Sequence, residues 1–293
     1  TYVGDRVSSV TKNGKTKTYS WGVSGNDGSL TTLATATGAG ATAQRVSDPD
    51  ILQVLQSTEG GMGVTTYEYD SYGRTQQQTN PEGDQTIATL DERGNVTEVR
   101  AVAKAGSGQA DLVTATSFDS SCSSNVTCNL PNYQIDPKGN RTDYAYDAVH
   151  GGITKEQLPA PISGGVRPET NYTYSQLYPQ VRNSANQLVN APTTQAKLTQ
   201  VTTCATAATC PGTANETRVT IAYNTPNLQV SSVTVASGNG AISSTTSYTY
   251  DTADNLKTID GPLPGSADTT TLFYDSVNRK KGVIGPDPDG SGS

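Results

Sequence analysis

Apolar and polar positions alternate in short segments along this chain, and each segment ends in turn-forming residues. The clearest example is 67–74, which reads Tyr-Glu-Tyr-Asp-Ser-Tyr-Gly-Arg. Side chains two positions apart share one face of a strand, so this spacing predicts that Tyr67 and Tyr69 lie together. Asp70 favours a turn because its carboxylate accepts hydrogen bonds from backbone N–H groups two residues on, and Gly73 tolerates a positive φ. The segment therefore predicts a strand, a tight turn and a return strand.

The same pattern recurs down the chain. It is marked at the end of each strand segment by Asp, or by a polar residue in its place: Asp70, Asp91, Asp119, Asp147, Ser175, Asn224, Asp251 and Asp275. Successive marks are 21, 28, 28, 28, 49, 27 and 24 residues apart. This period predicts one β-hairpin per repeat, and the step of 49 suggests a degenerate copy between Ser175 and Asn224. No sustained helical period appears, so we expect little or no helix.

A second turn pattern, Asn-Pro-x-Gly or Asp-Pro-x-Gly, lies between the marks at 80–83 and 136–139. Proline fixes φ at the second position of a β-turn, and glycine suits its end. A single hairpin cannot bury its aromatic face alone, whereas stacked neighbours can. The two turn patterns together therefore predict a continuous array of hairpins.

These units resemble the YD repeats of bacterial RHS proteins, which also occur in insecticidal toxin complexes and in animal teneurins. The resemblance covers about residues 60 to 290, is specific at 69–74 and 136–147, and is loose from 178 to 222. The residues that carry it are Tyr69, Asp70, Gly73, Arg74, Asp136, Pro137, Gly139, Tyr146, Asp147, Tyr250, Asp251, Tyr274 and Asp275. The resemblance implies an all-β fold in which antiparallel hairpins form a continuous sheet that spirals into a hollow shell.

Four regions follow along the chain. Residues 1–60 are expected to form divergent N-terminal hairpins, and 61–174 to hold YD repeats with a first Cys loop. Residues 175–218 are expected to be an irregular insertion with a second Cys loop, and 219–293 to return to YD repeats. Both ends look like cuts within a longer array.

Composition supports a thin sheet. Only 33% of the residues are hydrophobic, and the chain has 15 Tyr but 2 Phe, 1 Trp and 1 Met. A compact globule with a thick core usually contains more large apolar residues. The net charge of −7, without a basic cluster, disfavours nucleic-acid binding. No stretch approaches the ~20 apolar residues of a membrane-spanning helix.

The four cysteines form two local pairs, Cys122 with Cys128 and Cys204 with Cys210, each with five residues between. Equal local spacing in Ser/Thr-rich segments predicts two short disulfide loops. A zinc site is the alternative, but it usually has closer cysteines, and the chain has one His. Disulfides persist in oxidising compartments, so we expect an extracellular or cell-surface location, bacterial if the resemblance holds.

Few residues in the sequence suggest a catalytic or metal-binding site. His150 is the only histidine, and no Gly-x-Ser-x-Gly motif accompanies it, so a turn residue is the simpler interpretation. The closely spaced Asp287 and Asp289 suggest a calcium site, but a repeat turn explains the same residues and is the preferred interpretation. Adjacent acids that a glycosidase would need occur at Asp48/Asp50, Asp91/Glu92 and Asp287/Asp289. All three pairs also fit turns, and we expect neither catalysis, nor a metal, nor a cofactor.

Two functions remain. The first is a structural β scaffold in a large secreted or cell-surface protein, forming a shell around cargo or an extended fibre. Its partners would be the flanking repeats, further copies in a filament, or an enclosed C-terminal toxin. The alternative is an adhesin-like surface that binds glycans or proteins through exposed Tyr and Asn.

Overall fold

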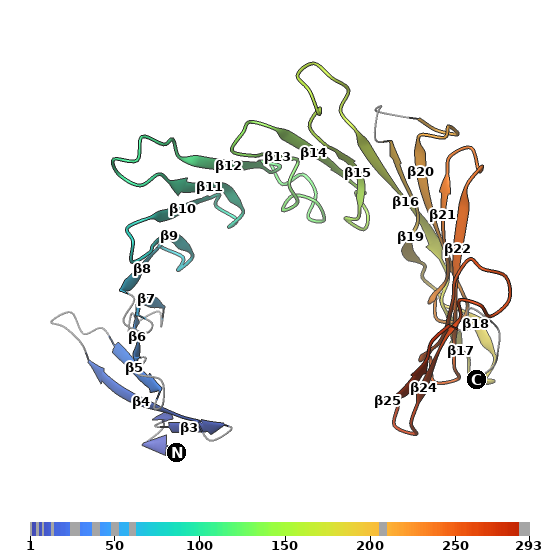
Figure 1. Ribbon diagram of the computed structural model, residues 1–293, viewed down its shortest axis with the longest axis horizontal. Coiled ribbons are helices and arrows are strands. Elements are labelled where there is room, and N and C mark those ends of the chain that lie inside the picture. Colours follow the sequence, from blue (N-terminus) through green and yellow to red (C-terminus); the bar gives the residue numbers. More distant parts are fainter. Residues whose placement is uncertain are drawn as a thin grey trace. The chain divides into compact units, whose positions relative to one another are not determined.

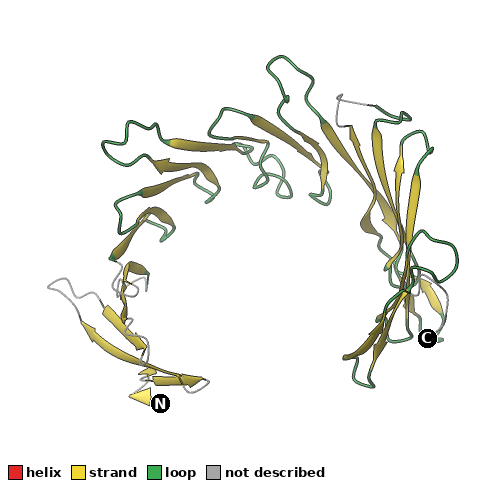
Figure 2. Ribbon diagram, in the orientation of Figure 1, coloured by secondary structure: helices red, strands yellow, loops and turns green. Residues whose placement is uncertain are grey.

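The computed structural model describes residues 63–204 and 210–286 throughout; before Gly63 it describes Gln53 and strands β1–β7. The described residues form strands, turns and loops, and none of them is helical (Figure 2). The chain divides into two compact units, one of Thr1–Ser123 with Cys128–Asn140 and one of Ser124–Thr127 with Arg141–Ser293. The predicted all-β class of repeated antiparallel hairpins is confirmed.

In the first unit, consecutive strands from β3 to β13 pair antiparallel with their neighbours in chain order (Figure 1). A separate pair, β1 with β2, precedes them. The strands are β1 (Tyr2–Val3), β2 (Arg6–Val7), β3 (Ser9–Lys12), β4 (Lys15–Val23), β5 (Leu30–Ala36), β6 (Thr42–Ser47), β7 (Val54–Thr58), β8 (Val64–Tyr69), β9 (Thr75–Thr79), β10 (Gln85–Leu90), β11 (Val96–Val102), β12 (Leu112–Ser117) and β13 (Tyr133–Ile135).

Within the second unit, consecutive strands also pair antiparallel in chain order, except that β17 and β18 form a hairpin of their own between β16 and β19. Its strands are β14 (Arg141–Tyr146), β15 (Ile153–Gln157), β16 (Glu169–Leu177), β17 (Gln180–Arg182), β18 (Leu188–Asn190), β19 (Gln195–Cys204), β20 (Glu216–Tyr223), β21 (Val230–Ser237), β22 (Ser243–Tyr250), β23 (Leu256–Asp260), β24 (Thr270–Tyr274) and β25 (Lys280–Ile284).

The 49-residue step is one repeat, so the expectation of a degenerate copy is wrong. β16 pairs directly with β19, and β19 pairs with β20, which leads into the turn at Asn224. The extra residues lengthen β16 and β19 and add the β17–β18 hairpin at the place of a tight turn. The stretch 175–218 is expected from the sequence to be irregular, but it contains the strands β17, β18 and β19. Polar segments rich in Thr and Gln pair well in a sheet whose two faces are both open to water.

The sheet has almost no interior. Among the described residues the buried apolar side chains are Cys128, Cys204, Cys210 and Leu228, and no side chain is completely buried. Three of these four belong to disulfides, which therefore take over part of the role of a hydrophobic core. Most of the described Tyr side chains are half-buried, whereas more than half of the described Val side chains are exposed, as a single layer of strands allows.

A register shift precedes the Asp turn in each clear repeat. It falls between Glu68 and Tyr69, and between Thr249 and Tyr250, immediately before the turn residue. The same shift occurs at Leu90, Tyr146, Tyr174, Tyr223 and Tyr274. One extra residue on the return strand re-aims the side chain that precedes Asp.

Candidate functional site

Six turns share one geometry, here called the Tyr-Asp turn, and they begin at Asp70, Asp91, Asp119, Asp136, Asp251 and Asp275. In the Asp70 turn, one carboxylate oxygen accepts the backbone N–H groups of Tyr72 (2.9 Å) and Arg74 (2.8 Å). The backbone N–H of Gly73 donates to the carbonyl of Asp70 (2.9 Å), and Gly73 has a φ of 78°. Arg74 also forms an ion pair with the second carboxylate oxygen. Three residues therefore close a Tyr-Asp turn: the Asp, a residue with positive φ three positions after it, and a hydrogen-bond donor four positions after it.

Other turns repeat these contacts with different side chains. Asp251 and Asp136 each accept two backbone N–H groups and the side-chain amide of an Asn four positions on. Asp275 uses Arg279, and Asp147 accepts the N–H groups of Val149 and His150. The position of Gly73 is taken by residues that all have positive φ: Gly94, Cys122, Gly139, Asp254 and Asn278. Pro137 occupies the second position of the Asp136 turn, where its ring fixes φ.

These hydrogen bonds lower the pKa of the turn carboxylates. The amide of Asn255 holds the pKa of Asp251 below its ordinary value of 3.8, and the backbone N–H of Arg279 does the same for Asp275. The hydroxyls of Ser123 and Ser121 lower the pKa of Asp119 further still. The turns are thus built for ionised carboxylates.

The side chain before Asp connects one hairpin to the previous one. The hydroxyl of Tyr250 donates to the carbonyl of Val230 (2.9 Å), and Val230 is the strand partner of Tyr223. Tyr223 itself donates to Leu198 (2.8 Å). Each hydroxyl thus reaches the residue that lies opposite the preceding tyrosine. We call this series the tyrosine ladder.

Hydrogen bonds of the tyrosine ladder occur in both units. Tyr274 donates to the carbonyl of Leu256 (3.0 Å), the strand partner of Tyr250, and in the first unit Tyr69 donates to Val54 (2.7 Å). Burial raises the pKa of Tyr223 and Tyr250, which keeps both hydroxyls protonated as donors. Leu90 and Phe118 occupy the same position without a hydroxyl, so the ladder is interrupted there.

A second set of hydrogen bonds joins successive turns. Arg74 donates to the carbonyl of Asp91 (3.3 Å) in the next Tyr-Asp turn. The amide of Asn255 likewise donates to the side chain of Asn278 (3.0 Å). Gln229 donates to the carbonyl of Asp254 (3.0 Å). Hairpins are therefore tied together at their turns as well as through their strands.

The first disulfide, Cys122–Cys128, closes a loop inside the Asp119 turn. Cys122 has a φ of 47° and stands where other turns have Gly. The hydroxyls and N–H groups of Ser121 and Ser123 bind the Asp119 carboxylate, and the loop is thereby fixed at its base.

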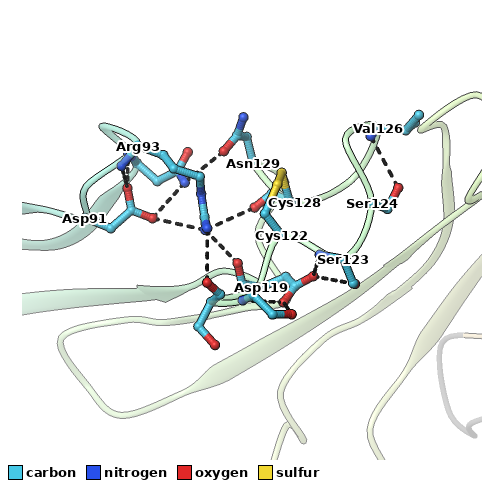
Figure 3. Close-up of a disulfide and its surroundings, with 12 residues drawn as sticks. Asp91, Arg93, Asp119, Cys122, Ser123, Ser124, Val126, Cys128 and Asn129 are labelled. Carbon is cyan, nitrogen blue, oxygen red and sulfur yellow. Dashed lines mark hydrogen bonds and ion pairs between the residues drawn. A yellow bond between two sulfur atoms is a disulfide. The ribbon is translucent and has the colours of Figure 1, made fainter.

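Arg93 fastens this loop to the preceding turn. Its guanidinium donates to the carbonyls of Asp119 (2.6 Å), Ser120 (3.3 Å) and Cys128 (3.5 Å) and forms an ion pair with Asp91 (3.2 Å). Figure 3 shows Arg93 lying between the Asp91 turn and the disulfide loop. Sequence reasoning missed this contact, because Arg93 and Cys128 are 35 residues apart.

The second disulfide, Cys204–Cys210, lies beside two buried acids. Cys204 is the strand partner of both Glu169 and Glu216, which are 8% and 4% exposed. Glu169 pairs with Lys155 (2.7 Å), and Glu216 pairs with Arg218 (3.0 Å). Each buried carboxylate is therefore neutralised by a cation, and we interpret both ion pairs as structural.

The remaining sequence candidates have turn roles or cannot be placed. His150 accepts the N–H of Gly152 (3.1 Å) through Nδ1 and packs on the ring of Tyr174 at 4.5 Å. Asp48, Asp50, Asp287 and Asp289 lie outside the described residues. In the part of the chain that the structure describes, no three His, Cys, Asp or Glu residues gather as metal ligands. Nor does that part contain a helix that could cross a membrane.

The fold is similar to that of a chain in a solved toxin complex. A chain in the structure of the Photorhabdus luminescens Tc holotoxin pore matches with a TM-score of 0.57 and 14% sequence identity, over 93% of this chain and 15% of that chain. The chain therefore shares its fold with a segment of that chain. A chain of the TcdB2-TccC3-Cdc42 crystal structure also matches, with a TM-score of 0.45 and 16% identity, over 94% of this chain and 12% of that chain.

No protein-family model matches the chain. No curated protein matches it either. The chain spans only 15% of the length of the first structural relative, so the likeness concerns the fold of a segment. That fold is of the kind expected from the Tyr-Asp and Asp-Pro-x-Gly motifs.

Proposed function

We propose that this chain is a structural segment of a large RHS-like polypeptide and forms part of the wall of a shell around cargo. The observation that carries the proposal is the tyrosine ladder. Hairpins are bonded to their neighbours by strand pairing and, at Tyr69, Tyr223, Tyr250 and Tyr274, by a tyrosine hydroxyl, and turn-to-turn contacts add further bonds. A wall of this kind is held by bonds between neighbouring repeats and needs no thick core.

The described residues form no deep core, and this fits a barrier better than an enzyme. Nearly every charged group in the motif positions is used to close a turn, as Asp70 with Arg74 and Asp275 with Arg279 show. A catalytic centre instead requires reactive groups directed at a substrate. We therefore assign the chain a mechanical role without turnover.

The two disulfides support a location outside the reducing cytosol. The toxin-complex fold supports enclosure, because a toxin would be the natural contents of such a shell. Flanking repeats of the same polypeptide would complete the wall, and the charge of −7 helps to keep a large β surface soluble.

Electron microscopy of the native particle that contains this chain tests the proposal. Closed hollow particles with density inside are expected. Long uniform fibres would reject enclosure and would instead support self-association through exposed strand edges. Limited proteolysis gives a second readout, since an enclosed polypeptide is cut only after the shell has been opened.

A further inference from the structure

The first unit contains a pocket at the place where the tyrosine ladder is interrupted. Its volume is about 620 Å3, and it lies between the Asp91 turn, the ends of β11–β13 and the segment that begins the disulfide loop. Pockets of about 300–1,000 Å3 are the usual size for small-molecule sites. The pocket is thus large enough for a ligand of one or two rings.

The sequence explains why this space is open. Phe118 lines the pocket and holds the position at which Tyr250 sends its hydroxyl to Val230. The corresponding acceptor for Phe118 is Val96, the strand partner of Leu90. Because Phe118 has no hydroxyl, this ladder contact is missing. Arg93 meanwhile holds the disulfide loop against the Asp91 turn and so forms one wall.

Two of the charged groups at the pocket are already used. Asp91 accepts the backbone N–H groups of Arg93 (2.9 Å) and Asn95 (2.8 Å) and the side chain of Asn95. The guanidinium of Arg93 is committed to three carbonyls and to Asp91. The pair therefore closes the wall but offers a ligand few free bonds.

The groups left for a ligand are polar hydroxyls, one carboxylate and one aromatic ring. Within the described residues, the hydroxyls of Thr116 and Ser117 and the carboxylate of exposed Glu92 have no protein partner. Phe118 supplies the ring. Hydroxyls both donate and accept, a carboxylate accepts, and aromatic rings cover apolar C–H faces.

The charged residues that line the pocket disfavour anionic ligands. Glu92 repels an anion, because Arg93 is already neutralised by its ion pair with Asp91 and the carboxylate of Glu92 remains as the net charge. The hydroxyls and the aromatic ring of the lining, rather than charge, favour a neutral polyol over a cation. We propose that this pocket binds a neutral carbohydrate of one or two rings, with Glu92 and Thr116 bonding its hydroxyls and Phe118 contacting its C–H face. The site adds recognition to the scaffold role and does not depend on it, because particle shape and sugar binding are measured separately.

Saturation-transfer NMR and calorimetry on the intact chain test the site with three probes: neutral disaccharides, a sialylated disaccharide and a polyamine. Saturation transfer is expected for neutral sugars at about 1 mM. Thr116→Val and Glu92→Gln are each expected to raise the Kd about tenfold, since valine lacks the hydroxyl and glutamine replaces a charge-assisted acceptor by a weaker neutral one. Tyr72→Ala is the matched control, because Tyr72 is an exposed aromatic of a neighbouring turn outside the pocket.

Phe118→Tyr separates binding from folding. Its hydroxyl fills part of the pocket and restores a ladder contact, so it should abolish sugar binding while the chain stays folded by circular dichroism. Absence of transfer from every neutral sugar would overturn the proposal. So would preferred binding of the sialylated sugar or the polyamine, or equal affinity in Thr116→Val, Glu92→Gln and the parent chain.

Discussion

The tyrosine ladder makes a sharp prediction for Tyr250→Phe. The substitution removes one oxygen atom and keeps the ring, so packing on the sheet is preserved. The lost hydroxyl is the donor to the Val230 carbonyl at 2.9 Å. This bond joins the β22–β23 hairpin to the β20–β21 hairpin, and the expected result is a weaker joint between these two hairpins.

The expected magnitude follows from the net worth of one hydrogen bond. Such a bond contributes about 0.5–1.5 kcal/mol, and Tyr250 is half-buried, so we expect a loss of about 1 kcal/mol. Changing Tyr223, Tyr250 and Tyr274 together should cost about 3 kcal/mol if the sites are independent. That is a large share of the ~5–15 kcal/mol that stabilises an ordinary domain.

Urea unfolding followed by circular dichroism measures this loss. With a slope of about 2–3 kcal/mol per molar urea, Tyr250→Phe should lower the midpoint by about 0.3–0.5 M. Hydrogen exchange of β20–β23 amides gives a local readout, because repeat arrays open at their weakest interface.

Tyr248→Phe is the matched control. Tyr248 lies two residues away on β22, and among the described residues its hydroxyl has no hydrogen-bond partner. This variant should leave the midpoint unchanged. Equal losses in the two variants, or no loss in Tyr250→Phe, would refute the ladder as a source of stability.

Three further predictions concern other positions of the array. Phe118→Tyr should raise the free energy of unfolding by about 0.5–1 kcal/mol, because the new hydroxyl reaches the Val96 carbonyl; an unchanged urea midpoint would contradict this. Gly139→Ala should lower the free energy of unfolding by about 1–2 kcal/mol because Gly139 has a φ of 82°, even though nothing lies within 4 Å of the added Cβ. Gly282 is equally open but has no positive φ, so Gly282→Ala should leave the urea midpoint unchanged or raise it slightly. The pKa of Asp251 is lower in the folded chain than its ordinary 3.8. The stability that its carboxylate contributes is therefore complete above pH 3.8 and is lost as the pH falls through the folded pKa. Asp251→Asn should flatten the loss of stability measured by urea unfolding between about pH 5 and pH 2, and an unaltered pH profile would count against the prediction.

The turns could be read from the sequence because their chemistry is local. Asp70, Gly73 and Arg74 lie within five positions, and their hydrogen bonds stay inside the same segment. The short disulfide loops are local in the same way, with six positions between Cys122 and Cys128. Side-chain type and spacing alone therefore determine these features.

The contacts between hairpins could not be read in this way. Tyr250 and Val230 are 20 residues apart, and their meeting depends on strand lengths and on a register shift that leaves no mark in composition. The pocket beside Arg93 likewise depends on a side chain that reaches across 35 residues. The one available signal was the choice of Tyr rather than Phe before Asp, which the aromatic-face interpretation did not use.

The β17–β18 hairpin shows how freely the array accepts additions. It stands between Leu177 and Gln195, which remain strand partners, so the frame on either side keeps its pairing. An insertion at this place changes length without changing the pattern that follows. A protein engineer could exchange Tyr178–Thr194 for an epitope, a fluorophore-binding tag or a small domain whose ends lie close together, and display it on an otherwise intact sheet.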